Sequence, residues 1–145
     1  MCIIIDANCC HKFTGNHEDA KPVHKWIVDR GGKIATGGKN LVELRAAGLS
    51  DLIVEYLRAG KVLIYQSLRI EEQRKQLKGV PKCSNDEHII FLARVSGSRL
   101  VFTKDNLLKK DLRNLSLVPK RNKCQVKIYD SKNDHKKLYS CPSCH

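Results

Sequence analysis

The sequence is poor in aromatic residues and in acidic residues. Phe, Trp and Tyr make up 6% of its 145 residues, and 15 Asp and Glu stand against 27 Lys and Arg, which gives a formal net charge of +12. So few aromatic side chains leave little surface on which nucleic-acid bases could stack, so recognition through phosphates and shape is expected instead. The positive charge itself indicates a polyanionic partner, because Lys and Arg that neutralise phosphates supply most nucleic-acid affinity. The alternative is a soluble basic protein without such a partner.

Long apolar segments are absent as well. No stretch approaches the roughly 18 apolar residues of a membrane span, so no membrane partner is expected. The first six residues, Met1 to Asp6, lack the basic segment, apolar segment and cleavage site of a signal peptide, which predicts a cytoplasmic protein. The seven cysteines are odd in number and scattered, as is typical of reduced thiols rather than of a disulfide framework.

Apolar runs of strand length alternate with amphipathic segments along the chain. The runs expected to form strands are 2–5, 33–36, 62–65, 99–103 and 125–129, and the expected helices are 17–29, 40–47, 52–59 and 70–78. A further helix, ending near Gly97, is expected to start at a capping box formed by Ser84 and Glu87. This alternation predicts an α/β fold of three α/β/α layers around a central, mostly parallel sheet. Residues 1–118 are expected to form the domain, and 119–145 a basic, Cys-containing extension that holds the last strand and a tail.

Carboxylates follow two of the predicted buried strands. Asp6 ends the run Ile3-Ile4-Ile5, and Asp105 follows Leu100-Val101-Phe102-Thr103. Because parallel strands end at one edge of their sheet, the two side chains would meet there if their strands are neighbours. Asp86 lies in the first turn of the predicted helix, where Ser84 and Glu87 already provide the cap. Glu43 lies beside the apolar stripe of its short helix.

A cluster of Asp6, Glu43, Asp86 and Asp105 would be strongly repulsive without a cation. Mg²⁺ and Mn²⁺ prefer oxygen ligands of this kind, and such ions activate water and stabilise the leaving oxygen of a phosphodiester. Each residue taken alone has an ordinary alternative. A strand-end Asp is commonly a turn residue, an Asp at a helix start is a favourable anion there, and most helical Glu side chains are solvated.

The order of these motifs resembles that of the PIN-domain nucleases, over about residues 1–118. The resemblance rests on Ile3-Ile4-Ile5-Asp6-Ala7-Asn8, on Glu43, on Asn85-Asp86-Glu87-His88 with the apolar residues after it, and on Thr103-Lys104-Asp105. It implies a PIN-like fold and an endoribonuclease with a Mg²⁺ or Mn²⁺ site at Asp6, Asp86 and Asp105, assisted by Glu43. It also implies that Thr103 supports the site, and that Asn8 stands where the family often has Ser or Thr. Many members are toxins with an antitoxin partner, and others process RNA, so a defence role, an inhibitor protein and a homo-oligomer are left open.

Two further groups of residues are candidates for binding. Seven Lys and Arg against two Asp lie between 104 and 123, and Lys104, Lys109, Lys110 and Arg113 are expected to hold RNA near the site. The chain ends in Cys141-Pro142-Ser143-Cys144-His145, which with Cys124 could make a structural zinc site. Because no second Cys-x-x-Cys pair is present, thiols without metal are the alternative. His88, one turn into the same helix as Asp86, could face the site, but an ordinary helix-face histidine is the preferred interpretation.

The sequence therefore predicts a metal-dependent endoribonuclease that hydrolyses RNA at a carboxylate cluster. The main alternative is a catalytically idle nucleic-acid-binding or scaffold module with the same fold. A phosphohydrolase with a strand-end Asp nucleophile is a third hypothesis, but it would need a second Asp where this chain has Asn8.

Overall fold

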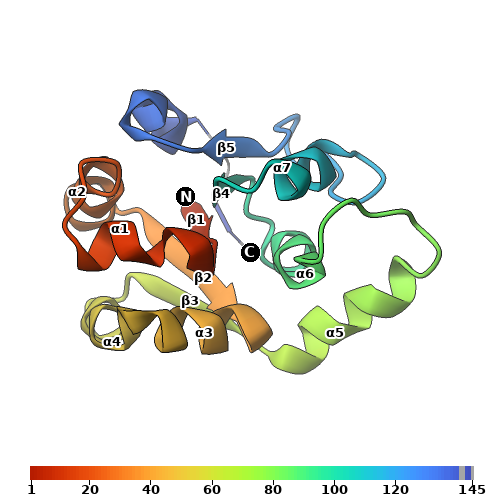
Figure 1. Cartoon of the computed structure of the whole chain (residues 1–145), viewed down its shortest axis with the longest axis horizontal. Helices are drawn as coiled ribbons and strands as arrows, with labels where there is room; N and C mark the ends of the chain where they lie inside the picture. The colour runs from red at the N-terminus through yellow and green to blue at the C-terminus, as the bar shows by residue number, and fades with distance from the viewer. Residues whose placement is uncertain (141–142, 145) are drawn as a thin grey trace.

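The predicted strands form one parallel sheet. The computed structural model of the chain, which describes residues 1–140 and 143–144, has an α/β fold with a five-stranded sheet in the order β3-β2-β1-β4-β5 (Figure 1). Its strands are β1 (Cys2–Ile5), β2 (Lys33–Gly37), β3 (Val62–Tyr65), β4 (Leu100–Phe102) and β5 (Lys127–Tyr129). Each neighbouring pair is parallel. The apolar β1 lies at the centre and is fully buried, as expected for a strand covered on both faces.

Helices connect the strands and cover both faces. The α-helices are α1 (Cys10–Thr14), α2 (Lys21–Arg30), α3 (Gly38–Leu44), α4 (Ser50–Arg58), α5 (Ser67–Gln76), α6 (Glu87–Ser96) and α7 (Asn106–Arg113). Shorter helical segments are η1 (Ala7–Cys9), η2 (Arg45–Leu49) and η3 (Lys132–Tyr139). The predicted helices are present with shifted ends, whereas α1, α7 and η3 had no counterpart in the sequence prediction.

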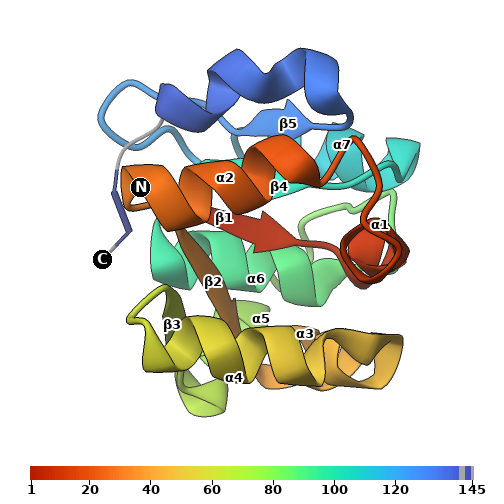
Figure 2. The same ribbon diagram turned by 90° about the vertical axis from the view of Figure 1, so that its left-hand side faces the viewer.

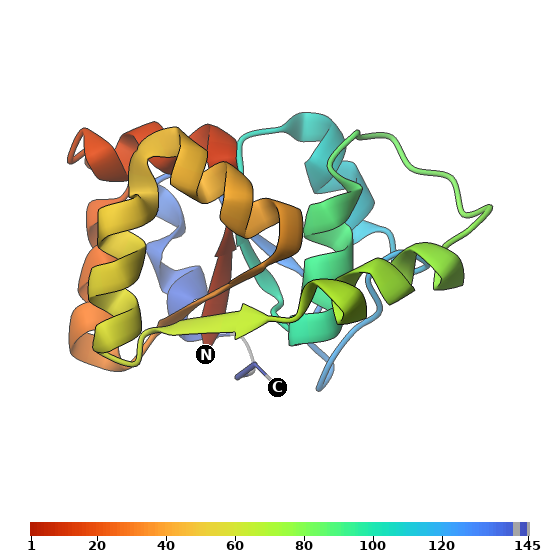
Figure 3. The same ribbon diagram turned by 90° about the horizontal axis from the view of Figure 1, so that it is seen from below.

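The sheet separates two hydrophobic cores because successive side chains of a strand point to opposite faces. Ile4 packs in the core formed with α5, α6 and α7. Ile3 and Ile5 pack on the other face, against α2, α4 and η3. Figure 3, seen toward the β3 edge, shows α4 on one side and α5 and α6 on the other. This is the three-layer α/β/α arrangement predicted from the sequence.

Segments at the C-terminal edge of the sheet begin directly after the strands. Figure 2 shows β1 pointing toward α1, with α2 lying alongside η3. Gly37 ends β2 with φ +157, and a side chain there would collide with the carbonyl oxygen of Tyr65, so only glycine allows this tight passage into α3. The sheet edge after β1, β2 and β4 is thus where short turns bring polar residues together.

Two local expectations are corrected by the structure. The capping box of Ser84 and Glu87 is absent: α6 begins at Glu87 after Asp86, whose side chain makes no capping hydrogen bond. Ser84 instead hydrogen-bonds Asp111, and Glu87 forms ion pairs with Arg74 and Lys82. The prediction that the cysteines stay reduced is wrong for one pair, since Cys2 and Cys144 form a disulfide.

The segment after residue 118 completes the sheet. Its strand β5 pairs with β4 from Leu100↔Lys127 to Phe102↔Tyr129, and Leu138 of η3 is buried in the core. Within residues 1–140 and 143–144, no helix is both long enough and apolar enough to cross a membrane.

Candidate active site

Asp6 is buried at the C-terminal end of the central strand. It is 2% exposed, and its backbone N–H donates to the carbonyl of Phe102 at 2.9 Å, which fixes it beside the end of β4. The Thr103 hydroxyl donates to Asp6 Oδ2 at 2.8 Å. Burial raises the pKa of Asp6, against the lowering effect of the Thr103 hydrogen bond. The site therefore holds a carboxylate that is costly to ionise where it lies.

Asp105 is tied to Asp6 through Thr103. The Asp105 backbone N–H donates to Thr103 Oγ1 at 3.1 Å, so one hydroxyl bridges the two predicted positions. The Asp105 side chain caps α7 by accepting from the backbone N–H of Leu107 at 2.9 Å and of Leu108 at 3.1 Å. Since β1 and β4 are neighbours, the two strand-end carboxylates lie at the same edge, as the sequence predicted.

Asp86 completes the group from the other side, at the start of α6. It is half-buried, and burial raises its pKa, with the negative charges of Asp6 and Asp105 raising it further. Asp105 also raises the pKa of Asp6. These mutual effects require three carboxylates close enough to repel one another, and no Lys or Arg of the described residues forms an ion pair with any of them.

Glu43 approaches the site indirectly, through His88. Its Oε2 lies 3.0 Å from His88 Nε2, and Lys39 Nζ lies 3.8 Å from Oε1. His88 is 5% exposed, and its Nδ1 has no hydrogen-bond partner among the residues described. His88 is close enough to Asp6 and Asp86 to lower the pKa of both, which agrees with the alternative, left open by the sequence, that it faces the site. Its place two residues after Asp86, on the first turn of the same helix, was the available signal.

Two supporting residues were missed by sequence reasoning. Asn40 Nδ2 donates to the carbonyl of Ile5 at 2.9 Å, and Thr36 donates to Asn40 Oδ1 at 2.6 Å, which holds the backbone just before Asp6. The buried Asp111 accepts from the backbone N–H of Cys83 and of Ser84, both at 2.8 Å, and so anchors the loop before Asp86. Asn8, a predicted support, contributes its backbone N–H, 3.4 Å from Asp6 Oδ1, while its side chain is exposed.

The predicted RNA-binding cations divide into two pairs. Lys104 and Lys109 both contact Asp130, with Nζ–O distances of 3.3 and 2.5 Å. Lys110 and Arg113 are both exposed on α7 and form no ion pair in the part of the chain that the structure describes. All four therefore lie on α7 or just before it, and Asp105 caps the N-terminal end of this helix.

Neither of the two predicted metal sites, for Mg²⁺ or Mn²⁺ and for Zn²⁺, is preformed among the described residues. Among residues 1–140 and 143–144, no set of three or more His, Cys, Asp or Glu is arranged to hold a metal ion. Of the predicted zinc ligands, Cys141 and His145 lie outside the described residues, and Cys144 is bonded to Cys2 rather than available as a thiolate. Cys124 is half-buried, with its sulfur 3.3 Å from the carbonyl of Gln125.

Comparison with known proteins identifies no relative: no family model, no curated protein and no solved structure matches the chain.

Proposed function

We propose that the chain is a metal-dependent nuclease that hydrolyses RNA at the site formed by Asp6, Asp86 and Asp105. The observation that carries the proposal is that these carboxylates lie near one another with no Lys or Arg ion partner among the described residues. Burial raises the pKa of Asp6 and of Asp86, and the neighbouring negative charges raise both further. Buried like charges are costly, and perturbed pKa values of this kind are typical of functional sites. The resemblance of the motif order to PIN-domain nucleases points to the same chemistry.

The donor set consists of the oxygen ligands that a hard divalent cation prefers. Mg²⁺ is commonly bound by one or two carboxylates and keeps several waters, so Asp6 and Asp86 are the residues that would hold it. Asp6 and Asp86 are the carboxylates whose ionisation a cation would favour most, because their pKa values are raised. When bound, Mg²⁺ or Mn²⁺ would supply charge neutralisation and activation of water at a phosphodiester.

The chain's own residues position the acidic groups and would position the RNA strand. Thr103 orients one oxygen of Asp6, and Glu43 fixes the His88 ring at the first turn of α6. Lys110 and Arg113 are exposed on α7, the helix that Asp105 caps at its N-terminal end, and form no ion pair among the described residues, so their positive charge would hold phosphates. A basic surface around an acidic site brings a polyanion to carboxylates that would otherwise repel it.

The test is cleavage of single-stranded RNA, structured RNA and single-stranded DNA in EDTA, Mg²⁺ or Mn²⁺. We expect metal-dependent cleavage of RNA by the parent chain, and a loss on the order of 100-fold or more for Asp6→Asn, because a metal site supplies several kcal/mol of transition-state stabilisation. Asp29→Asn is the matched control, since Asp29 is exposed on α2, and it should cleave at the parental rate.

Two results would contradict the proposal. Cleavage by Asp6→Asn at the parental rate would mean that the carboxylate site takes no part in the reaction. Salt-sensitive RNA binding by the parent chain without turnover in either metal would instead support the idle nucleic-acid-binding module.

A further inference from the structure

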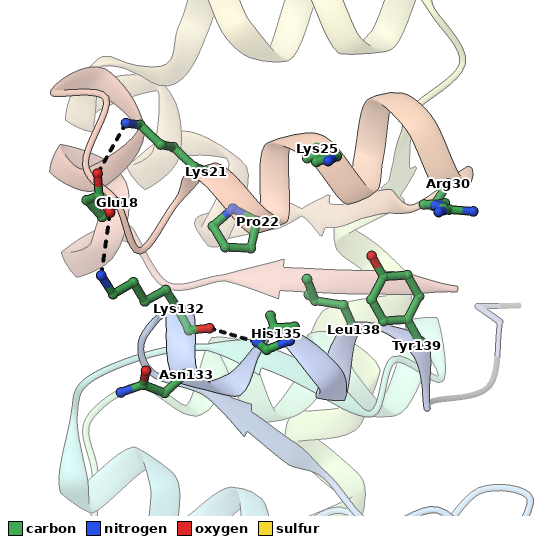
Figure 4. A pocket seen from close by; sticks show the side chains of 10 residues that line it. All are labelled: Glu18, Lys21, Pro22, Lys25, Arg30, Lys132, Asn133, His135, Leu138 and Tyr139. Atoms are coloured by element: carbon green, nitrogen blue, oxygen red, sulfur yellow. Dashed lines mark hydrogen bonds and ion pairs between the residues drawn. The ribbon is translucent and has the colours of Figure 1, made fainter.

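A groove of about 580 Å³ runs between α2 and η3, on the flank of the sheet away from α5 and α6 (Figure 4). Figure 4 shows Glu18 and Lys21 at one end of the groove and Arg30 and Tyr139 at the other. Its volume lies in the range of pockets that hold small ligands or short polymer segments. None of its lining residues belongs to the carboxylate site, so the groove needs a separate explanation.

Positive charge dominates the lining. Lys21, Lys25 and Arg30 come from α2, and Lys132 and His135 come from η3. Glu18 lies between two of these cations, 3.4 Å from Lys21 Nζ and 3.5 Å from Lys132 Nζ. Lys25 and Arg30 form no ion pair within the described part of the chain and are exposed. The groove therefore offers uncompensated charge to an anion along the length of α2.

An apolar surface lies among these charges. Pro22 and the buried Leu138 line the groove, and Tyr139 is 54% exposed beside Arg30 at its far end. A cationic groove with an exposed aromatic ring is the combination that holds single-stranded nucleic acid, because phosphates bind the cations and an unpaired base stacks on the ring.

Contacts through Asp19 link the Lys132 end of the groove to Lys104. The Lys132 backbone N–H donates to Asp19 Oδ1 at 3.0 Å, and Lys104 Nζ lies 4.0 Å from Asp19 Oδ2. Lys104 directly follows Thr103, the residue that bonds Asp6. From there the groove follows α2, whose ten residues span about 15 Å. A strand leaving the carboxylates past Lys104 would thus meet the groove.

We propose that the groove between α2 and η3 binds the single-stranded RNA that flanks the bond held at Asp6, Asp86 and Asp105. This proposal rests on the proposed function, and it assigns the part of the substrate beyond the reacting phosphate. Lys25 and Arg30 contact phosphates, and Tyr139 stacks on a base.

The first test measures binding of a fluorescent oligouridylate by anisotropy, in EDTA and in the Asp6→Asn background so that the probe stays intact. The groove pair Lys25→Gln/Arg30→Gln should bind more weakly, and its slope of log K against log salt should be smaller in magnitude by about 1.4, since each phosphate contact to a single strand contributes about 0.7. The matched pair Lys75→Gln/Lys78→Gln removes the same charge from exposed positions at the end of α5, on the opposite side of the molecule (Figure 1), and should keep the slope.

The second test separates stacking from general disruption. Tyr139→Leu should weaken binding of the oligouridylate about 5-fold or more, as expected for loss of a base–aromatic stack. Tyr139→Phe keeps the aromatic ring, so this variant should bind the oligouridylate as tightly as the chain with Tyr139. In cleavage by the otherwise parental chain, the groove pair should raise KM for a long RNA with kcat unchanged, because the contacts bind ground state and transition state alike.

The outcomes distinguish this proposal from the proposed function. If Lys25→Gln/Arg30→Gln keeps the parental affinity and salt slope, the proposal for the groove is wrong even if the chain cleaves RNA. An equal loss of binding in Lys75→Gln/Lys78→Gln would contradict it as well. Loss of binding confined to the groove variants, in a chain that cleaves nothing, would support the groove and overturn the nuclease.

Discussion

Two buried aspartates at the same edge of the sheet are held in opposite ways. Asp19 is 8% exposed and accepts a hydrogen bond from the buried Lys12 ammonium at 2.6 Å, which lowers the pKa of Asp19 to about 2. Asp6 is 2% exposed and accepts from the Thr103 hydroxyl and, at 3.4 Å, from the Asn8 backbone N–H; its burial, together with the negative charge of Asp105, raises its pKa.

The difference separates a carboxylate with an ion partner from one without such a partner among the described residues. Asp19 forms an ion pair with Lys12 and also accepts a hydrogen bond from the backbone N–H of Lys132. It therefore joins the loop before α2 to η3. Asp6 has no such partner in the described residues, and the fold bears the cost of its charge without gaining an ion pair. Under the proposed function, the cation that would offset this charge is the divalent metal ion.

The largest expected effect is on stability at pH 7. Asp19→Asn should lower the free energy of unfolding by about 3 kcal/mol, because it leaves the Lys12 ammonium buried without its counter-ion. Asp6→Asn should leave that free energy unchanged or raise it, since the substitution removes a costly buried charge. Urea unfolding followed by circular dichroism measures both. A destabilisation of Asp6→Asn as large as that of Asp19→Asn would erase the distinction between the two sites.

The second effect is the pH dependence of stability, which has opposite signs for the two residues. The pKa of Asp19 is lowered to about 2 in the folded chain from an ordinary value near 3.9, so its contribution is complete above that ordinary value. About 2 kcal/mol is lost as the pH falls from 4 to 2. The raised pKa of Asp6 acts in reverse: its contribution is complete at low pH and is lost as the pH rises through the folded value.

Unfolding of the parent chain and of each Asn variant between pH 2 and 7 tests these signs. The stability of Asp19→Asn should depend less on pH between 4 and 2 than that of the parent. Asp6→Asn should gain on the parent as the pH rises. Parallel curves for all three proteins would mean that neither carboxyl changes its pKa on folding.

The sequence predicted the sheet well because the apolar runs carry the decisive signal. Ile3-Ile4-Ile5 and Leu100-Val101-Phe102 can be buried on both faces only as inner strands, and both are inner strands. What could not be predicted was how distant polar residues pair. Asp111 looks like a solvated residue of a charged segment, yet it is 2% exposed because it binds the loop at Cys83 and Ser84, far away in sequence.

The same limit applies to the site and the groove. The strand ends placed Asp6 and Asp105 together, but the contact of Glu43 with His88 depends on how α3 packs near α6. The groove was not predicted, because residues 132–139 resemble a polar tail. Only the buried Leu138 and the alignment of η3 with α2 show that this segment packs on the domain and lines the groove.

The smallest effect concerns the hydroxyl of Thr103, which donates a hydrogen bond to the buried Asp6 carboxylate. The Thr103 hydrogen bond lowers the pKa of Asp6, so Thr103→Val should raise that pKa further and reduce stability by about 1 kcal/mol. The acid limb of kcat/KM for RNA cleavage should move to higher pH, because ionised Asp6 is then harder to form. Thr103→Ser keeps the hydroxyl but loses the methyl group, whereas Val keeps the methyl group and loses the hydroxyl. A shifted limb in Val alone therefore assigns the effect to the hydrogen bond, and an equal shift in both variants would assign it to packing and contradict the role given to Thr103.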